Sequence, residues 1–158
     1  MSEPATTLLF GLDKLDMLLK MYTRDFNEAH WKARPGGELH SGHWILAHLA
    51  LSLNQETGRE IVFGTELDKA LDYGAPVEER PEDWPDPDTL LLRHEEGLAA
   101  LRALWMGRGQ EEWQAPVGEN RLGIANQAQS AMFVLVHALY HVGQLGAIRR
   151  LLGLKGVV

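Results

Sequence analysis

The amino-acid sequence predicts an all-α protein, a four-helix bundle that forms a single domain over residues 1–158. Apolar residues recur at spacings of three and four in four long segments, which is the helical period. Glycine and proline concentrate between these segments, where they end helices. No segment shows a convincing alternation of apolar and polar residues, so no strand is predicted. A chain of 158 residues can bury a core of its own without disulfides or a second domain.

The first helix is expected at residues 5–30, and the next connection at 31–41. Gly11 interrupts the helix at a cost of about 1 kcal/mol, and the connection contains the helix-breaking run Pro35-Gly36-Gly37. The apolar stripe of this helix consists of Leu8, Leu12, Leu15, Leu19 and Tyr22. Such a stripe is typical of a helix that faces a bundle core.

The second helix is expected to run from Gly42 to Phe63, with Ser41 as its N-cap. Residues 64–87 contain two glycines, four prolines and an acidic run, so no long helix is predicted there. A connection of this length is typical of a crossover between helices that are not hairpin neighbours. We expect Trp84 to pack this crossover onto the bundle.

The third helix is expected at residues 88–107, with Asp88 as its N-cap. It carries His94, whose neighbours Arg93 and Glu95 are charged, so this ring is expected to be partly exposed. Residues 108–124 are predicted to form an irregular link.

The fourth helix is expected at residues 126–152 with Asn126 as its N-cap. Arg149 and Arg150 lie in its last turn and Gly153 follows, a combination that helix C-termini favour. One stripe along this helix is expected to face the core: Phe133, Val134, His137, Tyr140, His141, Gln144, Ile148 and Leu151.

His137 and His141 carry the clearest chemical signal in the chain. Residues four apart on a helix leave the same face, about 5–6 Å apart at Cβ, so the two rings can bind one metal ion. Buried rings without partners cost of order 1–3 kcal/mol each, and a metal would satisfy both. Hydrogen bonds to buried polar groups are the alternative. The chain has no cysteine, so any metal must be held by nitrogen and oxygen.

A third histidine strengthens the case for a metal site. His48 is the only histidine placed well inside the second predicted helix. His30, His40 and His43 lie near the entrance of that helix or in the preceding loop, where most histidines are exposed and inert. Glu56, two turns after His48, and Gln144, three residues after His141, are candidates for a general base or for a group that orients a ligand.

Composition excludes several classes of partner. The net charge is −7 and the 15 Lys and Arg residues are scattered, whereas sequence-independent nucleic-acid binding requires a basic surface. The N-terminal residues lack the basic and apolar regions of a signal peptide. No apolar run approaches the length of about 18 residues that a membrane span needs. We therefore expect no nucleic acid, no membrane, and a cytoplasmic location.

Two segments resemble the DinB-like superfamily, which includes YfiT-like metal-dependent hydrolases. Gly42-His43-Trp44-Ile45-Leu46-Ala47-His48-Leu49 is similar to its Trp-x-x-x-His-Leu segment, and His137-Ala138-Leu139-Tyr140-His141-Val142-Gly143-Gln144 to its His-x-x-x-His-x-Gly-Gln ending. The resemblance implies an up-up-down-down bundle with a long crossover, in which His48, His137 and His141 bind a divalent metal. It also implies a homodimer, and activities that include thiol-dependent transferases and isomerases.

The leading hypothesis is therefore a metal-dependent hydrolase or a low-molecular-weight-thiol transferase that acts on a small molecule. Zinc or nickel is expected, with iron as a further option, because all three accept imidazole. One alternative is a non-catalytic metal-binding or stress-response dimer, in which the metal joins the second helix to the fourth. Another is a protein without metal, whose histidines form a hydrogen-bonded core. No motif assigns the substrate.

Overall fold

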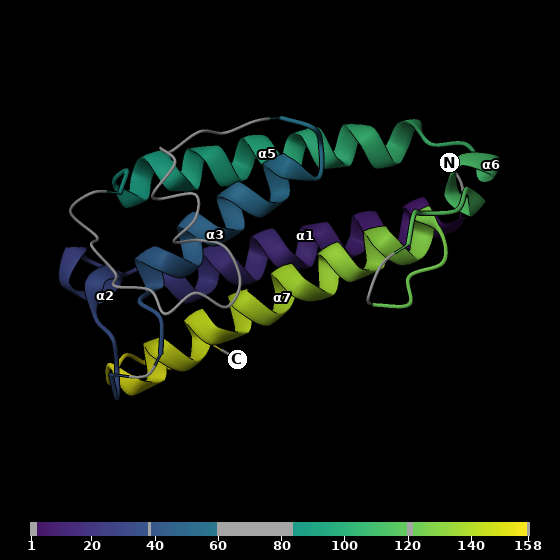
Figure 1. Cartoon of the computed structure of the whole chain (residues 1–158). Helices are drawn as coiled ribbons and strands as arrows, with labels where there is room; N and C mark the ends of the chain where they lie inside the picture. The colour runs from purple at the N-terminus through teal and green to yellow at the C-terminus, as the bar shows by residue number, and fades with distance from the viewer. Residues whose placement is uncertain (1–2, 38, 60–83, 120–121, 158) are drawn as a thin grey trace.

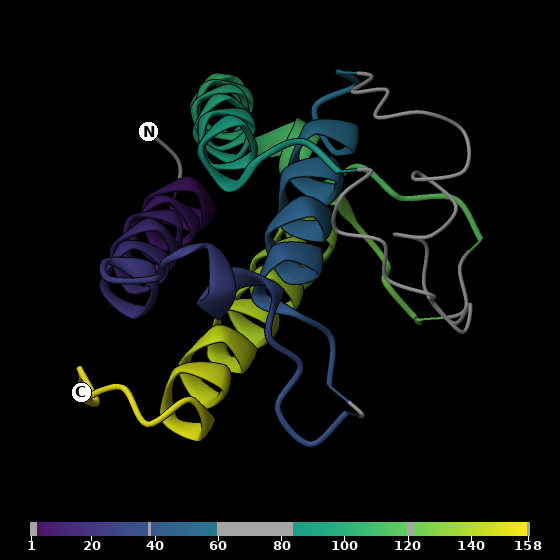
Figure 2. The ribbon, with the colours of Figure 1, turned by 90° about the vertical axis from the view of Figure 1, so that its left-hand side faces the viewer.

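The structure is a computed structural model that describes residues 3–37, 39–59, 84–119 and 122–157. These residues form helices and connections and contain no strand, as predicted. The helices are α1 (Glu3–Thr23), α2 (Glu28–Lys32), α3 (Gly42–Gln55), α5 (Pro87–Gly107), α6 (Gln110–Gln114) and α7 (Gln127–Leu151). Four of them are long and surround one core, with α1 and α3 on one diagonal and α5 and α7 on the other (Figure 2).

Contacts between the long helices show their relative directions. Arg149 at the end of α7 donates to the carbonyl oxygen of Tyr22 at the end of α1 (3.1 Å), so these helices are parallel. Asn54 at the end of α3 donates to the carbonyl oxygen of Arg93 in α5 (2.9 Å). His43 at the start of α3 binds the carbonyl oxygen of Pro85, just before α5 (2.7 Å), so α3 and α5 are parallel too.

The α1–α5 pair is antiparallel. Lys20 near the end of α1 pairs with Glu95 in the first half of α5 (3.1 Å), whereas Asp13 pairs with Arg102 further along α5. The helices therefore run up-down-down-up (Figure 1), and the expected up-up-down-down order is wrong. The physical reason is that the short link around α2 reverses the chain after α1. Only the connection from α3 to α5 joins opposite ends of the bundle.

Several predicted boundaries change. The expected helix at 5–30 is two helices, because Asn27 caps α2 by accepting from the backbone N–H of His30 (2.9 Å). Ser41 caps α3 as predicted, but α3 ends at Gln55, before a turn in which Gly58 has φ +68°. Most of the predicted crossover at 64–87 lies outside the described residues.

The second half of the chain agrees more closely with the prediction. Asp86, not Asp88, caps α5 by accepting from the backbone N–H of Thr89 (2.9 Å). Pro87 then takes the first helical position, where its missing N–H costs nothing. The link predicted to be irregular contains α6, whose Trp113 is fully buried. Asn126 caps α7 as predicted.

The core confirms the stripe of α1 and corrects that of α7. Leu8, Leu12, Leu15 and Leu19 are all buried. On α7, however, Phe133, Tyr140 and Leu151 are exposed by 43%, 56% and 61%. The buried residues are Ala131, Val134, Leu135, Ala138, His141, Val142, Leu145, Ile148 and Arg149. Apolar residues occur on every side of α7, so the helical period does not reveal which side faces the core.

The composition of α7 would suit a membrane, but its packing is that of a core helix. It is the one helix of the described residues that is long and apolar enough to cross a membrane, although the sequence predicted no such segment. It nevertheless packs against α1 and α3. Near its end the buried Arg149 guanidinium pairs with Asp25 and donates to the carbonyl oxygen of Lys155 (2.7 Å). α7 is thus a core helix of this bundle.

Candidate metal centre

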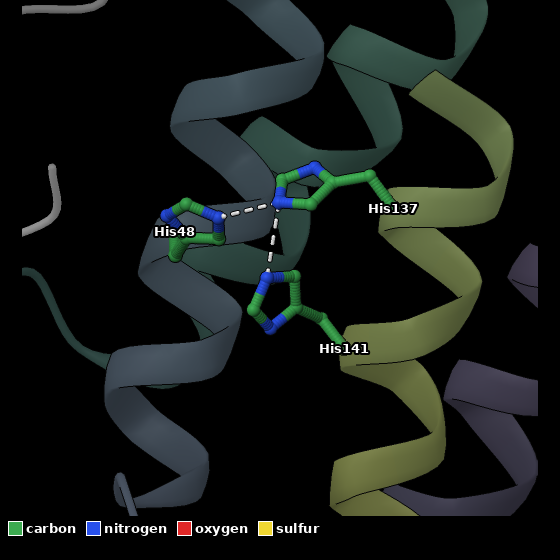
Figure 3. Close-up of side chains that lie close together, drawn as sticks. All are labelled: His48, His137 and His141. Atoms are coloured by element: carbon green, nitrogen blue, oxygen red, sulfur yellow. Dashed lines mark hydrogen bonds between the residues drawn. The ribbon is translucent and has the colours of Figure 1, made fainter. Parts of the chain in front are cut away.

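Three imidazole rings converge between α3 and α7. Nε2 of His137 lies 3.3 Å from Nε2 of His48 and 3.1 Å from Nε2 of His141. One potential ligand nitrogen from each ring lies within 4.8 Å of the other two. Figure 3 shows one ring from α3 and two from α7, all pointing into the same space. The three histidines chosen from the sequence therefore form a group that could hold a divalent metal.

The backbone explains this convergence. His137 and His141 are one turn apart on α7, so their rings leave the same side of the helix. α3 packs against α7 in the opposite direction. His48 lies two turns into α3, near the middle of the helix. All three ligands thus come from regular helices, which hold side chains more firmly than loops do.

Gln144 sets the proton position on His141. Oε1 of Gln144 lies 2.8 Å from Nδ1 of His141. An amide oxygen only accepts, so Nδ1 carries the proton and Nε2 keeps its lone pair for the shared space. The Gln144 amide donates in turn to the hydroxyl of Tyr140 (3.2 Å). Partners of this kind orient metal-binding histidines, so Gln144 has the contact expected of an orienting group.

The surroundings favour neutral rings. Burial, followed by the neighbouring His48 ring, lowers the pKa of His141 to about 4, although its bond to Gln144 raises it. Burial also lowers the pKa of His137. Both rings are therefore neutral near pH 7, the form in which imidazole binds a metal.

The donor set fits a metal ion better than it fits hydrogen bonding. Two nitrogens bound at 2.0–2.1 Å to one tetrahedral zinc lie about 3.3 Å apart, close to the two Nε2 separations of 3.3 and 3.1 Å. Since Nε2 of His141 only accepts, His137 must donate to it. Nε2 of His137 then cannot also accept from His48. The one proton on Nε2 of His137 can form a linear hydrogen bond to only one of the other two rings. A cation between the rings would instead bind the Nε2 lone pair of each of the three histidines.

Aromatic rings surround the group. The Trp44 indole lies flat against His48, with centroids 5.0 Å apart and planes 6° apart. His40 also stacks on the Trp44 indole, with ring centroids 3.7 Å apart. Trp44 was predicted only as part of the Trp-x-x-x-His-Leu segment and was given no role in the site, although its position one turn before His48 is the signal that could have indicated one.

The opposite side of the group is partly open. His137 is half-buried and stacks on Phe133 at 6.1 Å. Tyr140 contacts His141 edge-on at 5.1 Å. Phe133 and Tyr140 are themselves exposed, so an apolar surface lies next to the three nitrogens.

Glu56, the other candidate base, lies at the exposed end of α3 as its C-cap. Partial desolvation of its carboxyl group raises its pKa, against the opposing effect of Arg108. In the part of the chain that the structure describes, no carboxylate belongs to the histidine group. A catalytic role for Glu56 therefore stays a prediction without a supporting contact.

Three histidines outside the group, His43, His94 and His30, differ in their burial and in what their rings contact. His43 was expected to be exposed but is buried on α3, with its ring edge-on to the buried Trp84 at 5.2 Å. That contact packs the end of the crossover onto the bundle, as expected for Trp84. His94 was expected to be partly exposed but is 1% exposed, because α5 turns it inward and its charged neighbours outward. His30 belongs to the cap of α2.

Comparison with known proteins agrees with this fold. The sequence model of the DinB superfamily matches residues 12–145, most of the chain. The chain belongs to the DinB superfamily. A crystal structure described as a conserved protein from Enterococcus faecalis has the same fold, with a TM-score of 0.72 and 14% identity over 96% of this chain and 98% of that one. No curated protein matches the sequence.

Proposed function

We propose that this member of the DinB superfamily is a metal-dependent enzyme that acts on a small molecule, as a hydrolase or as a low-molecular-weight-thiol transferase. The observation that carries the proposal is the convergence of three Nε2 atoms at 3.1 and 3.3 Å. The half-open side of the site, next to His137, supports it. Zinc and nickel suit three imidazoles. A cytoplasmic location is part of the proposal.

The residues of the site would have distinct roles in such an enzyme. His48, His137 and His141 would hold the metal through Nε2, and Gln144 keeps the Nδ1 proton of His141 in place. Three neutral ligands leave room for water or substrate, and a metal bound in this way lowers the pKa of a coordinated water or thiol near neutral pH. With no cysteine in the chain, a thiol would come from the substrate. Phe133 and Tyr140 offer an apolar surface beside it.

A second function rests on a specific observation. The group joins two helices that are separated by 89 residues in the sequence (His48 to His137), and no carboxylate of the described residues joins it. A metal there would also hold α3 to α7, as in a non-catalytic metal-binding or stress-response protein. Chelation of the metal would then lower the melting temperature, and no substrate would be turned over.

Metal analysis of untagged protein tests the site itself. We expect about one metal ion per chain, and a metal content near zero after His137→Ala or His141→Ala. His30→Ala is the matched control, because His30 lies outside the histidine group. Undiminished metal in the His137 and His141 variants would rule the site out.

Turnover then separates the two functions. Metal-loaded protein is incubated with thiols and electrophiles, and with hydrolysable esters and amides, with and without chelator. Chelator-sensitive turnover that the His141→Ala variant lacks supports an enzyme. Full metal occupancy and a large chelator-induced fall in melting temperature, without turnover on any of these substrates, supports the structural role instead.

A further inference from the structure

The three candidate metal ligands differ in their access to solvent. His48 and His141 are 5% and 3% exposed, whereas His137 is only half-buried. The Trp44 indole, itself 3% exposed, lies flat against the His48 ring, so that side of the histidine group is filled by the protein. A molecule that joins a metal held by the three rings must therefore approach past His137.

The side chains that border His137 on the solvent side of α7 are apolar. Phe133, Val136 and Tyr140 are exposed by 43%, 55% and 56%. Spacings of three and four place Phe133 and Tyr140 on the same side of the helix as His137. Solvent reaches these positions, although the exposed side of a helix is usually polar. An apolar surface beside a few converging polar groups is suited to the apolar part of a small ligand.

Phe133 is the aromatic residue whose orientation relative to His137 is defined most closely. Its ring lies one turn of α7 before His137, about 5.4 Å along the helix axis. The planes of the two rings are 6° apart and their centroids are 6.1 Å apart, which is an offset stacked arrangement. This contact keeps the Phe133 ring beside His137, while 43% of the residue stays exposed. A planar group bound next to His137 can therefore lie against an aromatic ring.

The two helices that supply the ligands carry few charged side chains. α3 contains no Asp, Glu, Lys or Arg among its 14 residues. α7 contains no Asp or Glu among its 25 residues, and its basic residues, Arg149 and Arg150, lie in its last turn. The net charge of −7 therefore comes from other segments of the chain. Three neutral imidazoles leave both positive charges of a divalent metal in place, so a negatively charged ligand group is favoured there.

We propose that the metal centre takes a small anion that carries an aryl group, and that Phe133 confers the preference for the aryl group by stacking against it. This inference rests on the proposed function and adds a class of substrate to it. The anionic group of the ligand joins the three histidines at the metal, and its aryl ring lies against the Phe133 ring. An aliphatic anion of the same size reaches the metal equally well but gains less from Phe133. Phe133 is thus a specificity-determining residue.

Three probes of similar size test the two parts of this proposal. Benzoate has an aryl ring and a negative charge, cyclohexanecarboxylate has the charge without the aryl ring, and benzamide has the aryl ring without the charge. The full chain is loaded with zinc, its metal content is measured, and each probe is titrated into it in a calorimeter. Benzoate should bind about 2- to 10-fold more tightly than cyclohexanecarboxylate, and at least about tenfold more tightly than benzamide.

Variants of Phe133 test the role of its ring. Phe133→Leu keeps an apolar side chain but removes the aromatic ring, so it should abolish the preference for benzoate over cyclohexanecarboxylate and leave zinc content and helix content unchanged. Phe133→Tyr keeps an aromatic ring and should keep the preference. Phe10→Leu is the matched control, because Phe10 is 63% exposed but lies on α1. This control should bind all three probes as the wild type does.

The outcomes separate this inference from the proposed function. A chain that binds no zinc overturns both. A zinc-loaded chain that binds none of the three probes, or binds benzoate and cyclohexanecarboxylate equally, overturns the aryl anion as the substrate class and leaves the metal centre in place. Benzamide binding as tight as benzoate binding overturns the requirement for a negative charge. A preference for benzoate that persists in Phe133→Leu overturns the role of Phe133.

Discussion

Two buried histidine sites in this bundle differ in what their rings contact. Between α3 and α7, three rings contact one another, and Gln144 binds the inner nitrogen of His141. In the core beside α1, His94 is equally buried, and neither of its ring nitrogens has a hydrogen-bond partner in the described structure. The same side chain is thus a potential ligand in one place and an uncompensated polar group in the other.

The difference shows that burial alone does not identify a functional histidine. Burial lowers the pKa of both His94 and His141 to about 4. Only at His141 do other groups point their lone pairs into the same space. Convergence of several donors, each oriented by a partner, distinguishes a candidate site from a costly core residue.

Replacing His94 should give the largest change in stability. Its folded-state pKa of about 4 lies below the ordinary histidine value of 6.5, so the unfolded chain binds the proton more tightly. The contribution of His94 to stability is therefore fully present above pH 6.5 and is lost as the pH falls to 4, by about 3 kcal/mol. His94→Leu should abolish this part of the loss and leave the part due to His141, whose pKa is also lowered to about 4. The variant should be neutral or stabilising by about 1 kcal/mol at pH 7.

Urea unfolding with chelator present, at several pH values from 7 to 4, measures this effect. Asp16 and Glu95 oppose the shift at His94, and Lys20 favours it, so these residues are left unchanged. His94→Met is a second variant of different shape. If both variants lose stability toward pH 4 as steeply as the wild type, His94 is not the group responsible.

The sequence predicted the structure correctly at positions where the type and spacing of residues determine the local geometry. The four-residue spacing of His137 and His141, the caps Ser41 and Asn126, and the leucine stripe of α1 each have a local physical meaning, and the structure confirms it. These local features sufficed for the all-helical fold. The choice of His48, His137 and His141 as ligands rested on the histidine positions together with the resemblance to the DinB-like superfamily.

The errors arose where orientation depends on packing between helices. α7 is apolar all round, so nothing local indicated that Phe133 and Tyr140 face outward. His94 lies between charged residues, but neighbours along a helix point about 100° away and do not report its own direction. Helix order failed for a similar reason, because the direction of α3 depends on how the chain turns around α2.

Gln144 offers an intermediate effect that tests the importance of an oriented partner. Gln144→Leu removes the acceptor for Nδ1 of His141 and leaves the three Nε2 atoms in place. Metal affinity, measured by competition with a chelating dye, should fall about 10- to 100-fold. Gln144→Glu keeps an acceptor at the same position and should retain most of the affinity. Equal affinities in the Leu and Glu variants would show that Gln144 does not orient the ring.

Trp44 should give the smallest effect, because its side chain restrains His48 only through a stacked ring contact. Its indole lies parallel to the His48 ring and limits rotation of that ring out of the shared space. Trp44→Leu should lower metal affinity less than tenfold, about 1 kcal/mol, and Trp44→Phe should lower it less. Both variants lose packing in a buried position, so melting temperature should fall in each. If the stacked ring contact matters, the Phe variant should keep a higher metal affinity than the Leu variant even where their melting temperatures are equal. If only core volume matters, metal affinity should fall in proportion to melting temperature in both variants.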